Sequence, residues 1–314
     1  MRFPRPKRRW FQFSLRSILI VMTLLALCLG VITHRARQQR RAVEVFEKLG
    51  ARLWYDYQER GDRDPPGPAW LRELIGDEYF FSVTHVHFVG THITDADLVH
   101  LENLRELEFV RLDSTRITDA GLVHLKGLTS LEGLTVKRTR ITDKGLEHIE
   151  GLTNLQWLRL ADAQWGIRWD HLPEWIDLDI EGPQISDAGL AHLKRLTNLE
   201  QLLVSGPGIT DASLEHLKGL TRLRWLEITG TQITGAGLVH LKALTGLRQL
   251  VLDDAPITDA GLEHLKGLTE LTLLRISGTQ VTGAGIRNLE EALPELDICT
   301  TPSTCPPTKH LPRY

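Results

Sequence analysis

Residues 116–139 read RITDAGLVHLKGLTSLEGLTVKRT, and variants of this 24-residue phrase recur along most of the chain. Copies begin at His92, Arg116, Arg140, Gln184, Gly208, Gln232 and Pro256, and a weaker eighth copy runs from Gln280 to about Ile298. Residues 70–91 supply an entry unit in the same frame, and residues 164–183 are predicted to be a shortened unit. A fixed period of this length indicates a stack of repeats.

Each copy is predicted to hold one short strand and one short helix. Leu131, Leu134 and Val136 have strand spacing, whereas Leu122 and Leu125 lie on one face of a helix that begins after Thr118. Burying about seven apolar side chains per unit yields about 10–20 kcal/mol, less than the cost of ordering its backbone. A unit therefore needs neighbours. Adjacent strands lie about 4.8 Å apart, whereas packed helices need about 10 Å. The helical side of the stack must therefore spread, which curves the array. This predicts an α/β solenoid with a concave parallel sheet and short convex helices.

The unit LxxLxLxxTxITDxGLxHLKGL, over residues 92–298, resembles the leucine-rich repeats of the ribonuclease-inhibitor-like and F-box-associated type. The segment Phe13-Ser14-Leu15-Arg16 before one apolar helix is similar to that of bacterial membrane-anchored leucine-rich-repeat proteins. The resemblance implies the fold but no particular ligand. Where the family usually has a turn-closing Asn or Cys, this chain has Thr at 91, 115, 139, 231 and 279, and Ala163, Pro183, Pro207 and Ala255 elsewhere. Thr can partly replace Asn there, but Ala and Pro cannot. We therefore expect the short unit and the two prolines to disturb the curvature between residues 163 and 208.

The N-terminal region carries a membrane signal. Ser17–Thr33 is an uncharged run of 17 residues, at the lower end of what spans a bilayer as a helix. It lacks an A-x-A cleavage site, which favours an uncleaved single-pass anchor over a cleaved signal peptide or a buried core helix. Six basic residues precede the run and four follow it, which favours a cytoplasmic N-terminus. We therefore expect the repeats outside the cytoplasm, at a bacterial inner membrane.

The remaining segments complete a predicted domain plan. A basic segment (1–16) and the anchor (17–33) precede a juxtamembrane region (34–68), with a short helix at 42–49, a strand at 51–57 and a proline-rich linker at 62–68. The leucine-rich-repeat domain covers residues 69–298, and a proline-rich tail covers residues 299–314. Cys299 and Cys305 could form a disulfide if the domain is exported.

Charge argues against nucleic-acid binding. The net charge is −3, but residues 1–41 contain ten Lys or Arg and no acidic residue. Removing these ten from the 37 basic residues leaves 27 against 40 acidic ones, so residues 42–314 carry −13. Binding to phosphates needs the opposite sign. With three cysteines and no C-x-x-C pair, the chain also has no typical zinc motif.

Two recurring polar residues could be mistaken for a site. Histidines occupy one repeat position, at 100, 124, 148, 192, 216, 240 and 264, with His171 in the short unit. We expect each to contact the neighbouring unit; pH-linked stability and metal binding are the alternatives. Aspartates recur at 95, 119, 143, 187, 211 and 259, at each helix start, and are expected to cap helices. No Walker loop, nucleophile elbow or cofactor motif occurs, which predicts a protein that is not an enzyme and has no cofactor.

The outward strand positions vary while the inward ones repeat. Regular presentation of varied aromatic and charged groups is typical of a protein-recognition surface. The candidate partner-binding residues are Phe109, Arg111, Trp157, Arg159, Trp225 and Glu227. We therefore predict non-enzymatic protein–protein recognition by a membrane-anchored solenoid. The alternatives are a structural scaffold of the cell envelope and a substrate-recognition adaptor for a separate enzyme.

Overall fold

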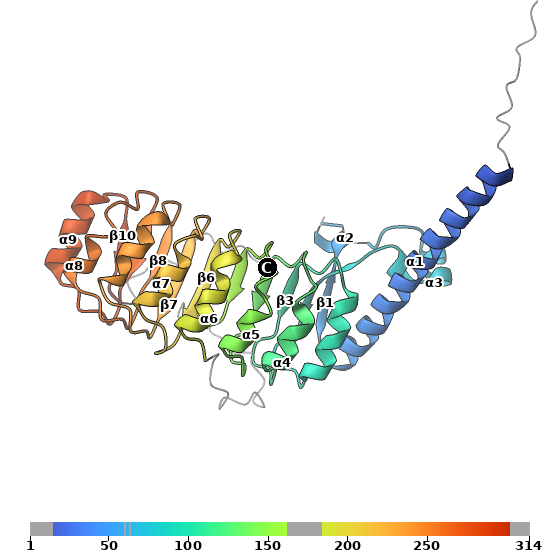
Figure 1. Cartoon of the computed structure of the whole chain (residues 1–314), viewed down its shortest axis with the longest axis horizontal. Coiled ribbons are helices and arrows are strands. Elements are labelled where there is room, and N and C mark those ends of the chain that lie inside the picture. The colour runs from blue at the N-terminus through green and yellow to red at the C-terminus, as the bar shows by residue number, and fades with distance from the viewer. Residues whose placement is uncertain (1–14, 60, 63, 162–183, 302–314) are drawn as a thin grey trace, which may run out of the picture.

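The computed structural model describes residues 15–59, 61–62, 64–161 and 184–301 of the chain. Its strands form one ten-stranded sheet in chain order, from β1 to β10 (Figure 1). The strands are β1 (Arg52–Tyr55), β2 (Val83–His87), β3 (Phe109–Arg111), β4 (Gly133–Thr135), β5 (Trp157–Arg159), β6 (Gln201–Ser205), β7 (Trp225–Thr229), β8 (Gln249–Val251), β9 (Leu273–Arg275) and β10 (Asp297–Cys299). Every pair from β2 to β10 is parallel, as predicted. The β1–β2 pair is antiparallel.

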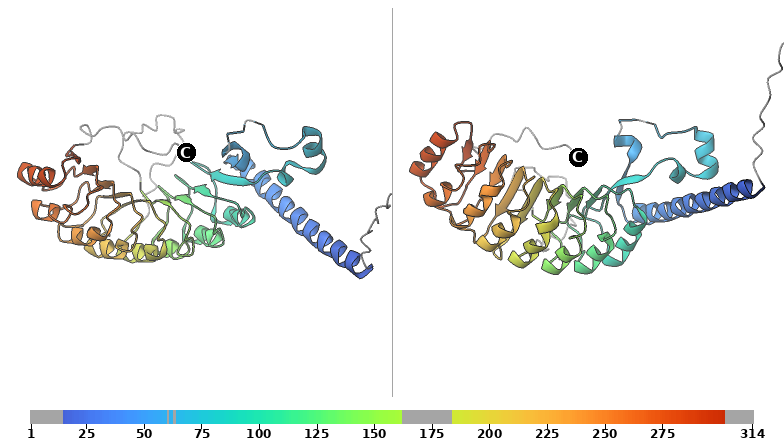
Figure 2. Two further views of the ribbon diagram at one scale, coloured as in Figure 1. Left: turned by 90° about the horizontal axis from the view of Figure 1, so that it is seen from above. Right: turned by 45° about the horizontal axis from the view of Figure 1, so that its top comes forward.

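Short helices cover the outer face of this sheet, and Figure 2 shows the resulting arc with strands on the concave side. The α-helices are α1 (Leu15–Lys48), α2 (Asp56–Glu59), α3 (Ala69–Ile75), α4 (Asp119–Leu122), α5 (Asp143–Glu147), α6 (Asp187–Ala191), α7 (Asp211–Leu217), α8 (Asp259–Leu262) and α9 (Gly283–Ala292). The 3₁₀ helices are η1 (Asp77–Tyr79), η2 (Asp95–Asn103), η3 (Val123–Leu125), η4 (His192–Arg195) and η5 (Gly237–Ala243). The curved α/β solenoid is thus confirmed.

A continuous apolar core fills the space between sheet and helices. The repeated leucines are fully buried and form one cluster that runs from α1 to the last repeat. Leu122, Leu125, Leu131 and Leu134 each have 0% exposure, as the repeat pattern predicts. This shared interior is what a single unit could not supply alone.

The N-terminal helix is longer than predicted. The anchor and the short helix at 42–49 are parts of one 34-residue helix, α1. Its first part is apolar and exposed, and by length and composition it could cross a membrane or serve as a signal sequence. Its last part is docked: Phe46 is fully buried and meets the ring of Phe88 edge-on, with centroids 5.0 Å apart. The last part of α1 therefore belongs to the N-terminal cap of the solenoid.

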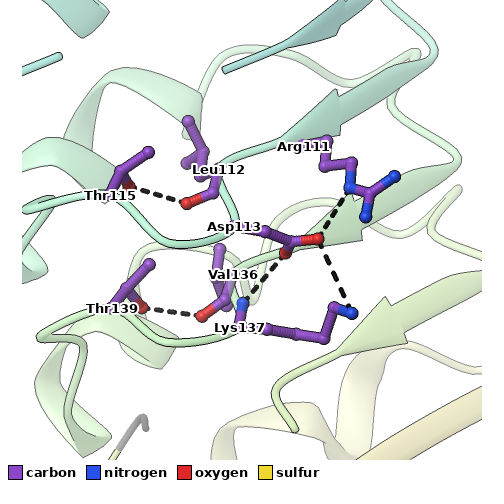
Figure 3. A network of polar contacts seen from close by, with 7 residues as sticks. All are labelled: Arg111, Leu112, Asp113, Thr115, Val136, Lys137 and Thr139. Carbon is purple, nitrogen blue, oxygen red and sulfur yellow. Dashed lines mark hydrogen bonds and ion pairs between the residues drawn. The ribbon is translucent and has the colours of Figure 1, made fainter. Parts of the chain in front are cut away.

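Threonines close the turns after the strands, as expected for the positions where relatives have Asn or Cys. The hydroxyls of Thr115 and Thr139 donate to the carbonyl oxygens of Leu112 and Val136, at 2.6 and 2.7 Å (Figure 3). Thr91 and Thr279 make the same bond in their own repeats, at 2.8 Å. Each hydroxyl donates to a carbonyl oxygen of the turn, and at Phe88 this oxygen also accepts the backbone N–H of Thr91.

The recurrent aspartates join successive repeats. The N–H and the hydroxyl of Thr118 donate to the two carboxylate oxygens of Asp95 in the preceding repeat, at 2.8 and 2.6 Å. The same pair of bonds links Asp119 to Thr142, Asp143 to Ser186, Asp187 to Thr210, Asp211 to Thr234 and Asp259 to Thr282. Helix capping belongs instead to the Thr or Ser, whose side chain accepts a helix N–H, as at Thr118 and Thr142. The expectation that these aspartates serve as caps is therefore wrong.

The repeats on either side of residues 162–183 stack directly on each other. Leu158 on β5 pairs directly with Leu202 on β6. The helical sides also meet directly, because Asp143 accepts from Ser186 and Asn198 donates to the Thr153 carbonyl. The predicted shortened unit, residues 164–183, lies outside the described residues, and the repeat that begins at Gln184 stacks on the one that begins at Arg140. A 44-residue interval between Asp143 and Asp187 is one repeat with an insertion.

Candidate functional site on the concave sheet

Four of the predicted contact residues lie together on three adjacent strands. Phe109 and Trp157 flank Gly133, and Arg111 and Arg159 flank Thr135, in a parallel register across β3, β4 and β5. All four of these large side chains are half-buried. They therefore sit on the concave side of the sheet, where a bound chain could contact several at once.

Gly133 shapes this arrangement. A Cβ built on Gly133 would lie 2.1 Å from a ring carbon of Phe109, so the ring occupies the space that a side chain would take. The Phe109 ring is consequently laid across β4 toward the centre of the face. A larger residue at 133 would push it away.

Two histidines and a tryptophan extend the aromatic surface beyond Phe109. The His85 ring is stacked on Phe109, with centroids 5.7 Å apart and planes at 23°. His87 lies between Phe109 and Trp54, with centroids 5.6 and 4.3 Å away. Trp54 belongs to β1, which pairs with β2 through Trp54 and His85. The sequence shows alternation at 51–57 but gives no sign that this strand joins the sheet edge, so Trp54 was not a predicted site residue.

The environment keeps His87 neutral. Burial lowers the pKa of His87 to about 4, helped by the nearby positive charge of Arg111. A neutral imidazole between two aromatic rings extends an apolar surface rather than adding charge.

Arg111 and Lys137 both lie next to the carboxylate of Asp113, beside the aromatic groups. Nε of Arg111 donates to Oδ2 of Asp113 at 2.7 Å, and Nζ of Lys137 lies 3.7 Å from the same oxygen (Figure 3). Oδ1 of Asp113 accepts the backbone N–H of Lys137 at 3.1 Å. Burial lowers the pKa of Arg159, while the negative charge of Asp113 opposes that shift. The carboxylate of Glu227 also acts on Arg159, so three cations face two carboxylates in this half of the concave face.

We call these residues the N-terminal concave surface, which comprises Trp54, His85, His87, Phe109, Arg111, Trp157 and Arg159. It combines aromatic rings with guanidinium groups, the residue types that anchor protein interfaces.

Trp225 and Glu227 do not belong to this surface. Both lie on β7 and are buried, with 5% and 1% exposure, so the prediction that they face solvent is wrong. Glu227 lies between Leu203 and Val251 in the register of the sheet. Side chains on strands about 4.8 Å apart pack against each other on a concave face, which the repeat pattern alone does not reveal.

The histidine position behaves as expected where contacts are defined. Nδ1 of His124 lies 2.7 Å from Oε1 of Glu102 in the preceding repeat, and His192 pairs with Glu150 in the same way. His100 packs against Phe46 of α1, with centroids 6.2 Å apart. His171 lies outside the described residues. Within the described ranges, no three His, Cys, Asp or Glu side chains gather as metal ligands.

Cys299 ends β10, is buried and is disulfide-bonded. Its predicted partner, Cys305, lies outside the described residues, so this pairing stays a prediction.

Comparison with known proteins identifies the architecture. No protein-family model matches the chain, and no curated protein does. Among solved structures, internalin C2 of Listeria monocytogenes str. 4b F2365 is 24% identical, with a TM-score of 0.52 over 70% of this chain and 81% of the internalin. The internalin InlF of the same strain is 21% identical, with a TM-score of 0.28 over 69% of this chain and 86% of InlF.

A plant peptide hormone receptor, RGFR1, solved in complex with RGF2, is 14% identical. Its TM-score is 0.42, and the match covers 64% of this chain and 29% of the receptor. At these identities the likeness concerns the fold, and of these three structures internalin C2 is the one whose superposition supports it.

Proposed function

We propose that this chain, a leucine-rich-repeat protein, is a membrane-anchored receptor or adaptor that recognises another protein without catalysing a reaction. The main support for this proposal is the N-terminal concave surface. On it, Phe109 and Arg111 on β3 lie across β4 from Trp157 and Arg159 on β5. Its chemistry favours an extended protein segment that offers carboxylates to the guanidinium groups and apolar or aromatic side chains to the rings.

Two features support recognition over catalysis. The repeated Asp, Thr and His residues have structural partners in neighbouring repeats, as at Asp119–Thr142 and His124–Glu102. The varied residues instead lie on a preformed concave sheet. A rigid surface loses little entropy when it binds, which favours affinity.

Anchoring is supported by the continuity of α1. The apolar part of this helix is exposed, with Leu19, Met22 and Leu27 each more than half accessible. The same helix ends in the core at Phe46, so the solenoid is joined to the apolar segment without a flexible break. Such a helix would hold the repeats at a fixed position next to a bilayer.

The recognition proposal is tested with a double variant of the full chain. Trp157→Ala with Arg159→Ala removes one ring and one guanidinium from the concave surface, and we expect at least about a tenfold loss of partner capture from native membranes. Val123→Ala with Lys126→Ala is the matched control, because both are exposed on the convex side. If both variants capture the partner equally and have equal thermal stability, the concave surface does not bind the partner.

Topology has its own test. We propose that the repeats lie outside the cytoplasm at a bacterial inner membrane. Protease added to intact spheroplasts is then expected to digest the repeats, whereas complete protection would reverse the orientation.

A further inference from the structure

We propose that a groove between α1 and the first repeat binds an anionic phospholipid of the membrane in which the chain is anchored. This inference rests on the proposed anchoring. The groove has a volume of about 820 Å³. One face of α1 forms most of the groove. Arg105, in the loop after η2, is the residue of the described repeats that lines it.

The helical stripe changes character along its length. Leu27, Gly30 and Val31 form an apolar wall, and Arg35 and Gln38 follow on the same face one to two turns later. Gly30 leaves the wall open, because a Cβ added there would have no atom within 4 Å. At 1.5 Å per residue, the wall ends where the uncharged run meets the bilayer surface.

The cations of the groove lack carboxylate partners. Over the described residues, neither Arg35 nor Arg105 forms an ion pair. Farther along α1, by contrast, Arg40 is paired with Glu44 at 3.0 Å. Two uncompensated guanidinium groups beside an apolar wall match a ligand with a phosphate at one end and hydrocarbon at the other. A phospholipid of the surrounding bilayer has this chemistry and reaches the groove laterally.

The groove also explains why the anchor and the repeats would meet at this point. Because α1 is docked through Phe46, the loop that carries Arg105 is held at a fixed place beside the helix. A bound headgroup would link the two and fix the tilt of the solenoid relative to the bilayer.

Native mass spectrometry of the full chain, extracted from membranes in detergent, tests this inference. Phosphatidylglycerol and phosphatidylcholine with identical acyl chains are added separately. We expect the phosphatidylglycerol adduct to dominate, and Arg35→Gln with Arg105→Gln to reduce it about tenfold, the loss typical for a charge-assisted hydrogen bond. Gly30→Leu, which fills the groove without changing charge, should also reduce it.

Arg37→Gln with Arg222→Gln is the matched control. It removes the same charge, one cation from α1 and one from the repeats, and neither residue lines the groove. An equal loss in this control, or equal binding of the two lipids by the unchanged protein, would contradict the inference while leaving anchoring intact. Recovery of the chain outside the membrane fraction would overturn anchoring itself, and the groove with it.

Discussion

At the scale of single residues, the Asp–Thr bonds carry the stacking. Each aspartate accepts two bonds from the next repeat, and the pattern is interrupted where Gly235 replaces Asp. Thr258, which follows Gly235 by one repeat, correspondingly makes no side-chain cap bond. Ser213 shows the reverse case, because its hydroxyl adds a further bond to Asp187. Burial opposes the ionisation of Asp187, but bonds from Ser213 and Thr210 outweigh it and lower its pKa.

This interruption provides an internal control for the energy of the bond. Thr142→Ala removes the hydroxyl that donates to Asp119 and caps α5, and we expect it to lower the free energy of unfolding by about 1–2 kcal/mol. Thr258→Ala removes a hydroxyl without the Asp partner and should cost no more than about 0.5 kcal/mol. Urea denaturation of both variants measures the difference. Equal losses would mean that the two bonds of the Thr142 hydroxyl, to Asp119 and to the helix N–H, together add no stability.

His87 makes stability depend on pH. Its pKa is about 4 in the folded protein, below the ordinary value of 6.5, so the unfolded chain binds the proton more readily. The stability that His87 contributes is therefore complete above about pH 6.5 and is lost as the pH falls toward 4. We expect His87→Phe to lose less stability than the unchanged protein between pH 7 and 4.5, measured by urea midpoints. Parallel curves for the two proteins would show that His87 is not the titrating group.

At the scale of helices and strands, the sequence predicts those elements that recur in every repeat. The repeat frame locates β3 to β9 and the buried leucines, because a 24-residue period fixes which side chains face inward. It fails where a segment departs from the period. The cap helix α1 and the antiparallel strand β1 depend on tertiary contacts that a single copy of the motif does not encode. Trp54 at the site was missed for the same reason, whereas the burial of Trp225 was missed because the repeat pattern does not show how side chains of neighbouring strands pack.

The insertion can be tested by restoring the period. Deleting residues 164–183 joins Ala163 to Gln184 and leaves one 24-residue repeat between Arg140 and Gln184. Because β5 already pairs with β6, we expect this variant to fold with one cooperative transition and to change the free energy of unfolding by at most about 2 kcal/mol, the entropy of a shortened loop. Circular dichroism with urea denaturation measures this. Loss of the folded state would mean that the stack needs these residues.

At the scale of the whole molecule, the apolar segment and the proposed protein-binding surface lie in different places. The apolar part of α1 lies at one end of the arc, and the N-terminal concave surface lies on the half of the sheet nearest to it (Figure 2). The repeats carry excess negative charge, yet Arg111, Lys137 and Arg159 outnumber the two carboxylates near them, Asp113 and Glu227. Local positive charge in an acidic domain steers an acidic segment to that place and repels it elsewhere.

The most direct measurement of the central claim is site-specific photo-crosslinking in native membranes. A benzophenone amino acid is placed at Phe109, on the concave surface, and separately at Val123, exposed on the convex side. A protein recognised by the concave sheet should give a discrete adduct from position 109 and none from position 123. Adducts of equal yield from both positions, or from position 123 alone, would contradict recognition by this surface.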